Sequence, residues 1–361
     1  MKAAVFHGPH KKLTIEEVAV DKPQDFEVLV RTVGSGVCHS ELHFWEGHSI
    51  IAAPSILGHE AAGVVEAVGS RVSYVKPGDH VIARGSFCGQ CKQCLTGHMN
   101  RCTDRPGRTA NDAPRWTWNG KPLMPWGSNI SGWAEEMLLH ENQLVKIQPE
   151  VPLDVASLLG CAVITGFGAA IHTAKVHPGA SVAVFGAGGI GLSAIQGARF
   201  AGAQQVIAVD LADSKLQTAR EFGATDTVNA SKQDPVEAIK AATSDGLGVD
   251  YSFDAIGLAK VAIQCVQSLA PGGTATLIGV IPDDQVIPLG WRMLGGEQKV
   301  QGCIMGSNRF RLDLPMLADL YMDGRLKLDE MITRRGKLED VNDMMSALQR
   351  GEVTRQVMVL N

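Results

Sequence analysis

Half of the eight cysteines in this chain fall within one short stretch. Their spacing is C-x2-C-x2-C-x7-C, at Cys88, Cys91, Cys94 and Cys102. In a reducing cell interior, grouped thiolates bind metal more often than they form disulfides. Four sulfurs on one loop complete a tetrahedral shell and leave no position for a substrate. The spacing therefore predicts a structural zinc site.

The main alternative for these four thiols is an iron–sulfur cluster. Bacterial ferredoxins place three residues before the last cysteine of the run and a proline after it. Here seven residues precede Cys102, and Thr103 follows it. This difference favours zinc over an iron–sulfur cluster, and four thiols that are merely buried are the least favoured interpretation.

The remaining cysteines are dispersed, at Cys38, Cys161, Cys265 and Cys303. A single cysteine is usually a small buried apolar residue. Cys38 is different, because His59 and Glu60 follow it 21 and 22 residues later. A thiolate, an imidazole and a carboxylate would form an open zinc shell if one more protein ligand were supplied, and Cys161 is the candidate for that ligand.

A glycine-rich string, G-x-G-x-x-G, spans residues 186–191. It follows an apolar β-branched run at 181–185, precedes a helical pattern at 190–201, and has Asp210 nineteen residues beyond Gly191. In this context Gly186 makes the turn, Gly188 lets the backbone approach a pyrophosphate, and Gly191 allows close packing. Asp210 would bind the adenosine ribose hydroxyls and repel a 2′-phosphate, which favours NAD over NADP. The alternative is that the glycines serve only a strand-to-helix turn.

The pattern of expected helices and strands differs between the first part of the chain and the rest. Up to about residue 150, short β runs predict an irregular, mostly antiparallel domain; they lie at 27–33, 62–68, 80–83 and 134–139. A long excursion at 104–132, with little periodicity, interrupts this domain. From about residue 163, strands at 181–185, 205–209, 249–253 and 275–279 alternate with helices, one capped by Asp213 and ended by Gly223, another with Pro235 in its first turn. This alternation predicts an α/β domain with a doubly wound parallel sheet. The tail contains an amphipathic stretch at 338–348, and we expect it to fold back onto the first domain.

Composition excludes several classes of function. The chain has 361 residues, 45% hydrophobic and 20% charged, with a net charge of −5 and a pI near 6.1. Interspersed charges and an acidic pI leave no basic stripe for nucleic acid. The first residues enter an alternating pattern without an apolar signal segment. We expect a cytoplasmic protein that binds neither membrane nor nucleic acid.

Together these motifs resemble those of the zinc-dependent, medium-chain alcohol dehydrogenases, over essentially the whole chain. The resemblance implies a GroES-like catalytic domain over residues 1–162 and 305–361 and a Rossmann NAD-binding domain over 163–304. It implies two zinc ions per chain, a catalytic one on Cys38, His59 and Cys161, with Glu60 as an acidic neighbour, and a structural one on the four-cysteine loop. The implied reaction interconverts alcohols and aldehydes or ketones by hydride transfer to NAD.

The resemblance also implies roles for further residues. Ser40 would accept the proton of the alcohol and pass it through the nicotinamide ribose toward His43. Cofactor contacts are implied for His39, Thr165, Gly186, Gly188, Gly189, Ile190, Gly191, Asp210, Lys215, Val280 and Arg355. Within this set His39 and Arg355 would contact the pyrophosphate, Thr165 the nicotinamide and Lys215 the adenosine ribose. For these four, an ordinary solvated or packing role is the alternative.

The substrate is the least constrained part of the resemblance. It places Ser49, Trp126 and residues 84–87 along the pocket walls, and the aromatic side chains of Trp116 and Trp118 would either line a pocket for primary aliphatic or aromatic alcohols or pack in a core. A glutathione-dependent formaldehyde dehydrogenase is disfavoured, because Ser49 stands at its acidic position. The same motifs leave open a nicotinoprotein that retains NAD, a zinc-free quinone reductase and a non-catalytic NAD-binding protein. The length of the excursion between Cys102 and Cys161 resembles that of dimeric relatives, which implies a homodimer formed through the nucleotide domains.

Overall fold

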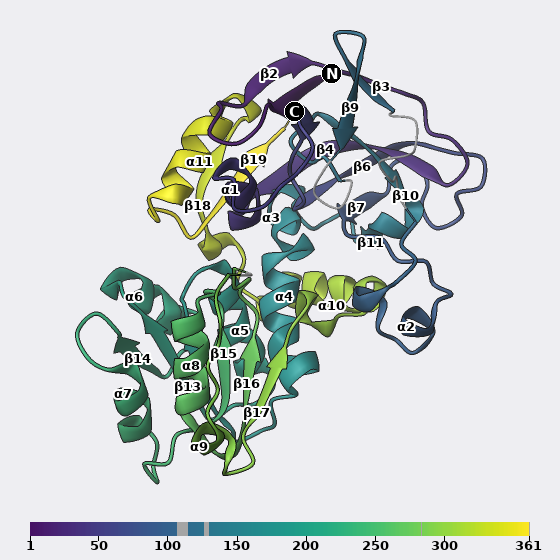
Figure 1. Cartoon of the computed structure of the whole chain (residues 1–361). Coiled ribbons are helices and arrows are strands. Elements are labelled where there is room, and N and C mark those ends of the chain that lie inside the picture. Colours follow the sequence, from purple (N-terminus) through teal and green to yellow (C-terminus); the bar gives the residue numbers. More distant parts are fainter. Residues whose placement is uncertain (107–114, 126–129, 283, 361) are drawn as a thin grey trace. The chain divides into compact units, whose positions relative to one another are not determined.

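Two units make up the computed structural model (Figure 1), which describes residues 1–106, 115–125, 130–282 and 284–360. Unit 1 contains Met1–Cys161 and Arg309–Asn361, and unit 2 contains Ala162–Asn308. The sequence suggested boundaries after residues 162 and 304. The C-terminal tail belongs to unit 1, as expected from its mixed pattern.

Unit 1 is built on two β sheets. Within the described residues, one sheet has the strand order β2-β1-β5-β9-β8-β3, and the other has the order β11-β7-β6-β4-β19-β18 with β10 also paired to β4. Neighbouring strands are antiparallel except for β5 with β9 and β18 with β19. The bounds are β1 (Lys2–Phe6), β2 (Thr14–Glu17), β3 (Ala19–Val20), β4 (Glu27–Val37), β5 (Ser55–Ile56), β6 (Ala61–Val68), β7 (His80–Ala83), β8 (Trp116–Trp118), β9 (Lys121–Pro125), β10 (Glu136–His140), β11 (Leu144–Ile147), β18 (Ile332–Gly336) and β19 (Arg355–Val359).

The long strand β4 is central to unit 1. It pairs with β6, β10 and β19, so three segments far apart in the sequence meet along it. Its side chains alternate between the two faces, as the period of a strand requires, and Val28 and Val30 are fully buried. β4 extends to Val37, beyond the predicted end at residue 33, because β19 supplies hydrogen-bonding partners as far as Val37.

The helices of unit 1 are short apart from α10. They are α1 (His39–Trp45), α2 (Lys92–Leu95), α3 (Leu153–Ser157), α10 (Phe310–Met322) and α11 (Val341–Gln349). In α11 the residues at helical spacing, Val341, Met344, Met345 and Leu348, are all buried in one hydrophobic cluster. The predicted amphipathic stretch is therefore a helix, although Leu338–Asp340 at its start form a separate 3₁₀ turn.

Unit 2 is a parallel six-stranded sheet with the order β14-β13-β12-β15-β16-β17 in the described residues. This order is that of a doubly wound sheet and confirms the predicted fold class. Its elements are α4 (Ala162–Gly168), a π-helical segment (Ala169–Ala174), β12 (Ser181–Phe185), α5 (Gly189–Phe200), β13 (Gln205–Asp210), α6 (Asp213–Glu221), β14 (Asp226–Asn229), α7 (Pro235–Ala242), β15 (Val249–Asp254), α8 (Ala259–Gln267), β16 (Leu269–Leu277), α9 (Trp291–Leu294) and β17 (Lys299–Gly302).

Helix boundaries in unit 2 test three predictions. Pro235 is the first residue of α7, and the carboxylate of Asp234 accepts hydrogen bonds from the next two backbone N–H groups. Gly223 follows α6 with a φ of +110°, as a terminating glycine should. The predicted cap at Asp213 is wrong. Ala212 is the N-cap and Asp213 lies in the first turn, where its carboxylate accepts from Asn229 Nδ2 and Lys232 Nζ, both at 2.6 Å.

In the described part of the chain, no single helix has both the length and the apolar character needed to cross a membrane. One bent pair, Leu153–Gly160 with Ala162–Ala174, passes on length and composition alone.

Candidate metal centres and nucleotide loop

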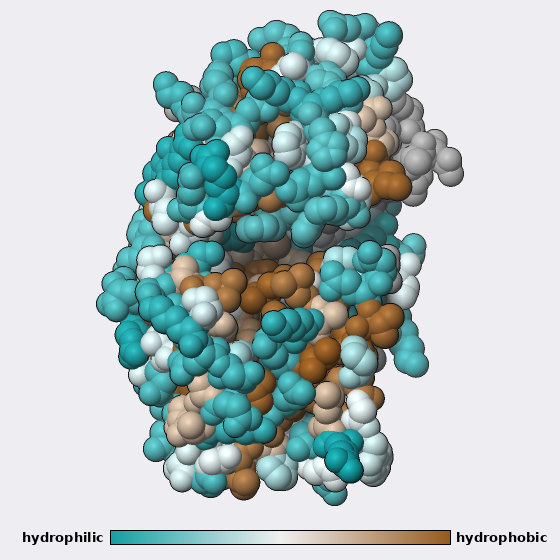
Figure 2. Space-filling view, turned by 60° about the vertical axis from the view of Figure 1, so that its left-hand side comes forward, coloured by the Kyte–Doolittle hydropathy of each residue, from teal (hydrophilic) through white to brown (hydrophobic). Residues whose placement is uncertain are grey.

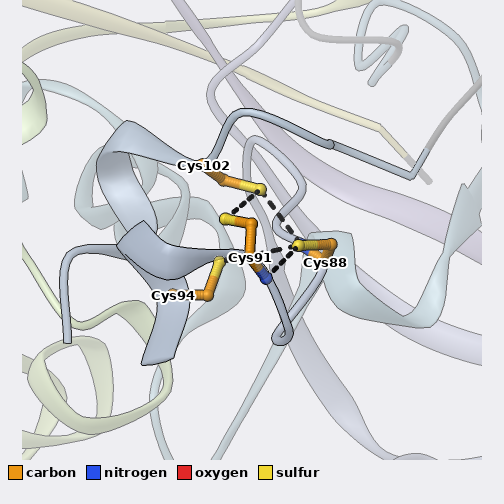
Figure 3. A group of neighbouring side chains, drawn as sticks. All are labelled: Cys88, Cys91, Cys94 and Cys102. Carbon is orange, nitrogen blue, oxygen red and sulfur yellow. Dashed lines mark hydrogen bonds between the residues drawn. The ribbon is translucent and has the colours of Figure 1, made fainter. Parts of the chain in front are cut away.

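The four clustered cysteines converge on one point (Figure 3). The Sγ–Sγ distances of Cys88–Cys94 and Cys91–Cys102 are both 3.9 Å. A disulfide needs about 2 Å between its sulfurs. Four zinc–sulfur bonds of about 2.3 Å in a tetrahedron separate the sulfurs by about 3.8 Å. The thiols therefore fit a zinc ion in a closed shell.

Backbone N–H groups prepare this loop for thiolates. The sulfur of Cys88 accepts from the N–H groups of Gln90 and Cys91 at 3.4 and 3.2 Å, and that of Cys102 accepts from the N–H of Cys88 at 3.2 Å. Hydrogen bonds from Thr103 and Cys94 lower the pKa of the Cys91 thiol to about 5. Such donors stabilise the charged form that a metal requires.

The second candidate metal group is assembled from three separate segments. Cys38 lies between β4 and α1, the pair His59–Glu60 lies directly before β6, and Cys161 follows the 3₁₀ segment Leu158–Gly160. The ligand atoms of these four residues all lie within 4.8 Å of one another, and His59 Nε2 is 3.3 Å from Cys161 Sγ. The structure thus brings together the residues that the sequence nominated for an open zinc site.

Electrostatics favour a metal at this group. A hydrogen bond from the Cys161 thiol lowers the pKa of Cys38 well below its ordinary value, and the positive charges of Arg355 and His59 act in the same direction against burial. Two sulfurs and one imidazole fill three positions of a tetrahedral zinc shell and leave the fourth open. These residues fit a zinc ion that can bind a substrate.

Glu41 supports this site, and the sequence analysis did not identify it. Its side chain is fully buried, Oε2 accepts from the backbone N–H of Cys38, and Oε1 accepts from the backbone N–H of His59, both at 3.2 Å. The same carboxylate contacts His59 Nδ1, which leaves Nε2 facing Cys161. Burial lowers the pKa of His59, but the Glu41 and Cys38 charges raise it well above its usual range overall. The signal in the sequence was an acid three residues after Cys38, the spacing of a capping box.

Glu60 pairs with Arg355 across a long sequence separation. Arg355 Nη2 donates to Glu60 Oε1 at 2.8 Å, and both side chains are buried. Burial raises the pKa of Glu60 to about 7, opposed by Arg355 and assisted by Cys38. Glu60 Oε2 has no hydrogen-bond partner among the described residues. A contact of Arg355 with a cofactor phosphate stays a prediction, since the structure shows this guanidinium on Glu60.

The residues expected to move the proton lie on α1. The Ser40 hydroxyl is 3.9 Å from Cys38 Sγ. His43 lies three residues further, on the same side of the helix, and its Nδ1 is buried without a partner in the described part of the chain. His39 is exposed at the start of the helix. The structure places Ser40 beside the metal group, and the roles of all three residues remain predictions.

The glycine-rich turn has the geometry of a nucleotide loop. It lies between β12 and α5, at the point where the strand order of the sheet reverses. Gly186 has a φ of +96°, and a Cβ on Gly191 would lie 1.7 Å from the Gly186 carbonyl oxygen. A Cβ on Gly188 would meet nothing within 4 Å, so space is open above the backbone there. The turn and the N-terminus of α5, which includes Gly189 and Ile190, fit a cofactor pyrophosphate.

Asp210 ends the strand next to this turn. Its Oδ2 accepts from the N–H of Ala187 at 2.8 Å, which ties the carboxylate to the glycine-rich turn. Lys215 is partly exposed on α6, and Val280 is 78% exposed after β16. Thr165 is buried on α4 and donates to Met305 Sδ at 3.8 Å. The cofactor contacts of these residues are predictions that the structure leaves open.

The residues nominated for a substrate pocket divide into three groups. Trp116 is fully buried in the hydrophobic core of unit 1, and Trp118 packs against that core. Both tryptophans therefore have the packing role that was the alternative to lining a substrate pocket. Residues 84–87 are buried, with the Arg84 guanidinium 4.2 Å from the centre of the Phe310 ring, and burial lowers the pKa of Arg84 to about 10. Ser49 is exposed, and Trp126 lies outside the described residues.

Comparisons with known proteins agree with this geometry. Two family models match, Alcohol dehydrogenase GroES-like domain over residues 24–149 and Zinc-binding dehydrogenase over residues 189–319. The chain is 39% identical to an alcohol dehydrogenase class-3 of Zea mays, over 99% of this chain and 96% of that protein. It is similar to the solved structure of a benzyl alcohol dehydrogenase from Acinetobacter calcoaceticus, with a TM-score of 0.94, 30% identity and coverage of 100% and 99%. An alcohol dehydrogenase zinc-binding domain protein from Burkholderia ambifaria has a TM-score of 0.95, 34% identity and coverage of 100% and 98%.

Removing the charge of Glu41 tests its role as the support of the open site. In Glu41→Gln the amide cannot hold His59 as the carboxylate does, so we expect the affinity for zinc at the open site to fall by about 10- to 100-fold. Competition with a chelator, followed by metal analysis, measures this affinity. The exposed Glu150→Gln variant is the control, and equal zinc retention in both variants would contradict the role.

Proposed function

The chain belongs to the zinc-dependent, medium-chain alcohol dehydrogenase family, and from this premise we propose that it oxidises primary aliphatic or aromatic alcohols with NAD at the open group of Cys38, His59 and Cys161. Its class is that of an oxidoreductase interconverting alcohols and aldehydes or ketones. The observation that carries the proposal is the convergence of two thiols, an imidazole and a carboxylate from distant segments, separate from the closed four-cysteine loop.

Zinc bound at this group would supply a Lewis acid that polarises the substrate oxygen and lowers the pKa of the alcohol. The chain's own residues then have two tasks. Glu41 holds the imidazole of His59 in one orientation. Ser40, beside Cys38, takes the proton of the alcohol, and His43 delivers it outward. Glu60, buried beside the metal ligands with one oxygen unpartnered in the described residues, is close enough to act as a transient ligand.

The proposed cofactor is NAD, from the glycine-rich turn and Asp210. The open space at Gly188 and the N-terminus of α5 would hold the pyrophosphate, with His39 and Arg355 as further phosphate contacts. The Asp210 carboxylate, held by three backbone N–H groups, would accept from the ribose hydroxyls beside Lys215. Thr165 and Val280 complete the proposed cofactor contacts.

The likeness to a benzyl alcohol dehydrogenase supports an aromatic alcohol as one substrate. Ser49, where the resemblance places an acidic residue in the glutathione-dependent formaldehyde dehydrogenases, is exposed and uncharged, and it argues against a glutathione adduct. The proposed location is the cytoplasm, where reduced thiols can bind zinc.

Metal analysis combined with activity tests the function directly. We expect two zinc ions per chain and turnover of primary and aromatic alcohols with NAD. Cys38→Ser should lose one zinc and its turnover, because a ligand of the open site is removed. Cys94→Ser should also lose one zinc, but its first effect should be to destabilise the four-cysteine loop and not to abolish turnover. Cys303→Ser, outside both groups, is the control. Unchanged turnover in Cys38→Ser would contradict the proposal.

Asp210 should set the choice of cofactor. In Asp210→Asn the repulsion of a 2′-phosphate and the charged acceptor for the ribose are both lost. We expect the ratio of kcat/KM with NAD to that with NADP to fall by about tenfold or more, because a hydrogen bond to a charged group contributes about 1.5–3 kcal/mol. Steady-state kinetics with both cofactors measure the ratio, and the exposed Asp245→Asn variant provides the baseline.

We also propose a homodimer formed through unit 2. Hydrophobic surface gathers on unit 2, in the lower part of Figure 2. Val286 and Trp291 are 80% and 83% exposed and precede β17, one of the two edge strands of the sheet, in the sequence. Exposed apolar side chains and the open edge of a sheet are each typical features of an interface between copies.

Trp291→Glu tests the dimer. A charge at this position should weaken association, so sedimentation should show a monomer at concentrations where the unmodified chain is a dimer. Leu312→Glu, an exposed leucine of unit 1, should leave the dimer intact. A stable tetramer, or a Trp291→Glu dimer of unchanged stability, would contradict the proposed interface.

A further inference from the structure

A third cluster of metal-binding side chains lies at the end of α1. His43, Glu46 and His48 each offer a ligand atom within 4.8 Å of the others. None of them belongs to the closed loop or to the group of Cys38, His59, Glu60 and Cys161. Their arrangement follows from how the helix ends.

The end of α1 is a Schellman cap. Glu46 is the C-cap, and Gly47 follows with a φ of +77°. The N–H of Gly47 donates to the carbonyl of Phe44 at 3.2 Å, and the N–H of His48 donates to that of His43 at 2.9 Å. This cap folds the residue after the glycine back over the last turn, where an apolar contact usually forms. Here both positions of that contact hold histidines, with ring centroids 5.7 Å apart.

Glu46 adds a carboxylate to the two imidazoles. Its Oε2 is 3.4 Å from His48 Nδ1. Metal–nitrogen and metal–oxygen bonds of about 2.0–2.2 Å in a tetrahedron separate such ligands by about 3.4 Å. Gln349 Nε2 donates to the other oxygen, Oε1, at 2.9 Å, which orients the carboxylate and leaves Oε2 directed to the histidine. The glutamate and His48 are thus spaced as two ligands of one ion.

His43 supplies the inner side of the cluster. Its Nδ1 is buried and has no hydrogen-bond partner among the residues that the structure describes. A buried, unpaired nitrogen is unfavourable, and a metal ion or a proton donor would relieve the cost. The His48 side chain is 65% exposed, so an ion can enter from solvent and keep water in its remaining positions.

We propose that His43, Glu46 and His48 form a third metal site, which takes a divalent ion that prefers imidazole, such as Zn²⁺, Ni²⁺ or Cu²⁺. Two imidazoles and one carboxylate do not suit Mg²⁺ or Ca²⁺, which need a shell of oxygens. Three protein ligands, one of them on the surface, make this site weaker than the closed four-cysteine shell.

Occupation of the site has a consequence that rests on the proposed function. His43 is the outward end of the proposed proton route from Ser40. A metal ion on its imidazole holds the nitrogen lone pair and prevents it from accepting a proton. An excess of Zn²⁺ should therefore inhibit alcohol oxidation reversibly, without displacing the two resident ions.

The experiment uses the full chain already loaded with its two zinc ions. Equilibrium dialysis against Zn²⁺ should find a third ion per chain, removable by a weak chelator. Glu46→Gln and His48→Gln each remove one ligand and should weaken this binding by at least about tenfold, the lower bound set by the loss of even a supporting contact. Their turnover without added Zn²⁺ should equal that of the unmodified chain. His177→Gln, an exposed histidine of unit 2, should bind the third ion normally.

The outcomes separate the site from the function. Absence of a third ion, or a third ion that binds equally well to His48→Gln, overturns the proposed site. Binding that depends on His48, with inhibition that disappears in the same variant, supports both the site and the proton route. If binding depends on His48 but excess Zn²⁺ leaves the turnover of the unmodified chain unchanged, the site is supported and the proton route through His43 is wrong.

Discussion

The buried carboxylate of Glu41 is the contact on which the open metal group depends. It accepts the backbone N–H groups of Cys38 and His59 and contacts the His59 ring, so one side chain determines the positions of two ligands from different segments. A fully buried carboxylate is costly unless its oxygens are hydrogen-bonded or paired with charge. The backbone N–H groups of Cys38 and His59 and the His59 ring meet that requirement, and the resulting geometry leaves Nε2 of His59 available on the opposite side of the ring.

The two candidate metal groups differ in how much of the fold each requires. The four-cysteine loop draws all its ligands from residues 88–102 and depends on local turns and backbone N–H groups. The open group needs β4 to end at Val37, directly before Cys38, the segment before β6 to lie beside it, and Cys161 to reach both. β19 then brings Arg355 to Glu60 through its pairing with β4. A closed structural site can form from one segment, whereas the open site exists only when the sheet of unit 1 is complete.

This difference explains what could be predicted from the sequence. The candidate metal ligands that the structure brings together could be predicted because thiols and an imidazole at such spacing have few other uses. The glycine-rich turn could be predicted because a strand precedes it and a helix and Asp210 follow it in order. The supporting partners were not identifiable in the same way. The Arg355–Glu60 pair joins residues 295 positions apart. Glu41 was missed although it lies three residues from Cys38, because an acid near a helix start is usually only a cap. The spacing predicts a capping role for Asp213, but its carboxylate accepts from Asn229 and Lys232, partners that spacing does not reveal.

The room for a side chain next to the backbone also constrains the open metal group and the glycine-rich turn. A Cβ on Gly36 would lie 2.2 Å from Glu60 Oε2, so only glycine lets this carboxylate stand beside the metal ligands. A Cβ on Gly191 would overlap the carbonyl of Gly186, while one on Gly188 would enter open space. Gly36 and Gly191 are therefore required by the protein's own packing. Gly188 is not, and the proposed explanation for a glycine there is a ligand that the backbone must approach closely.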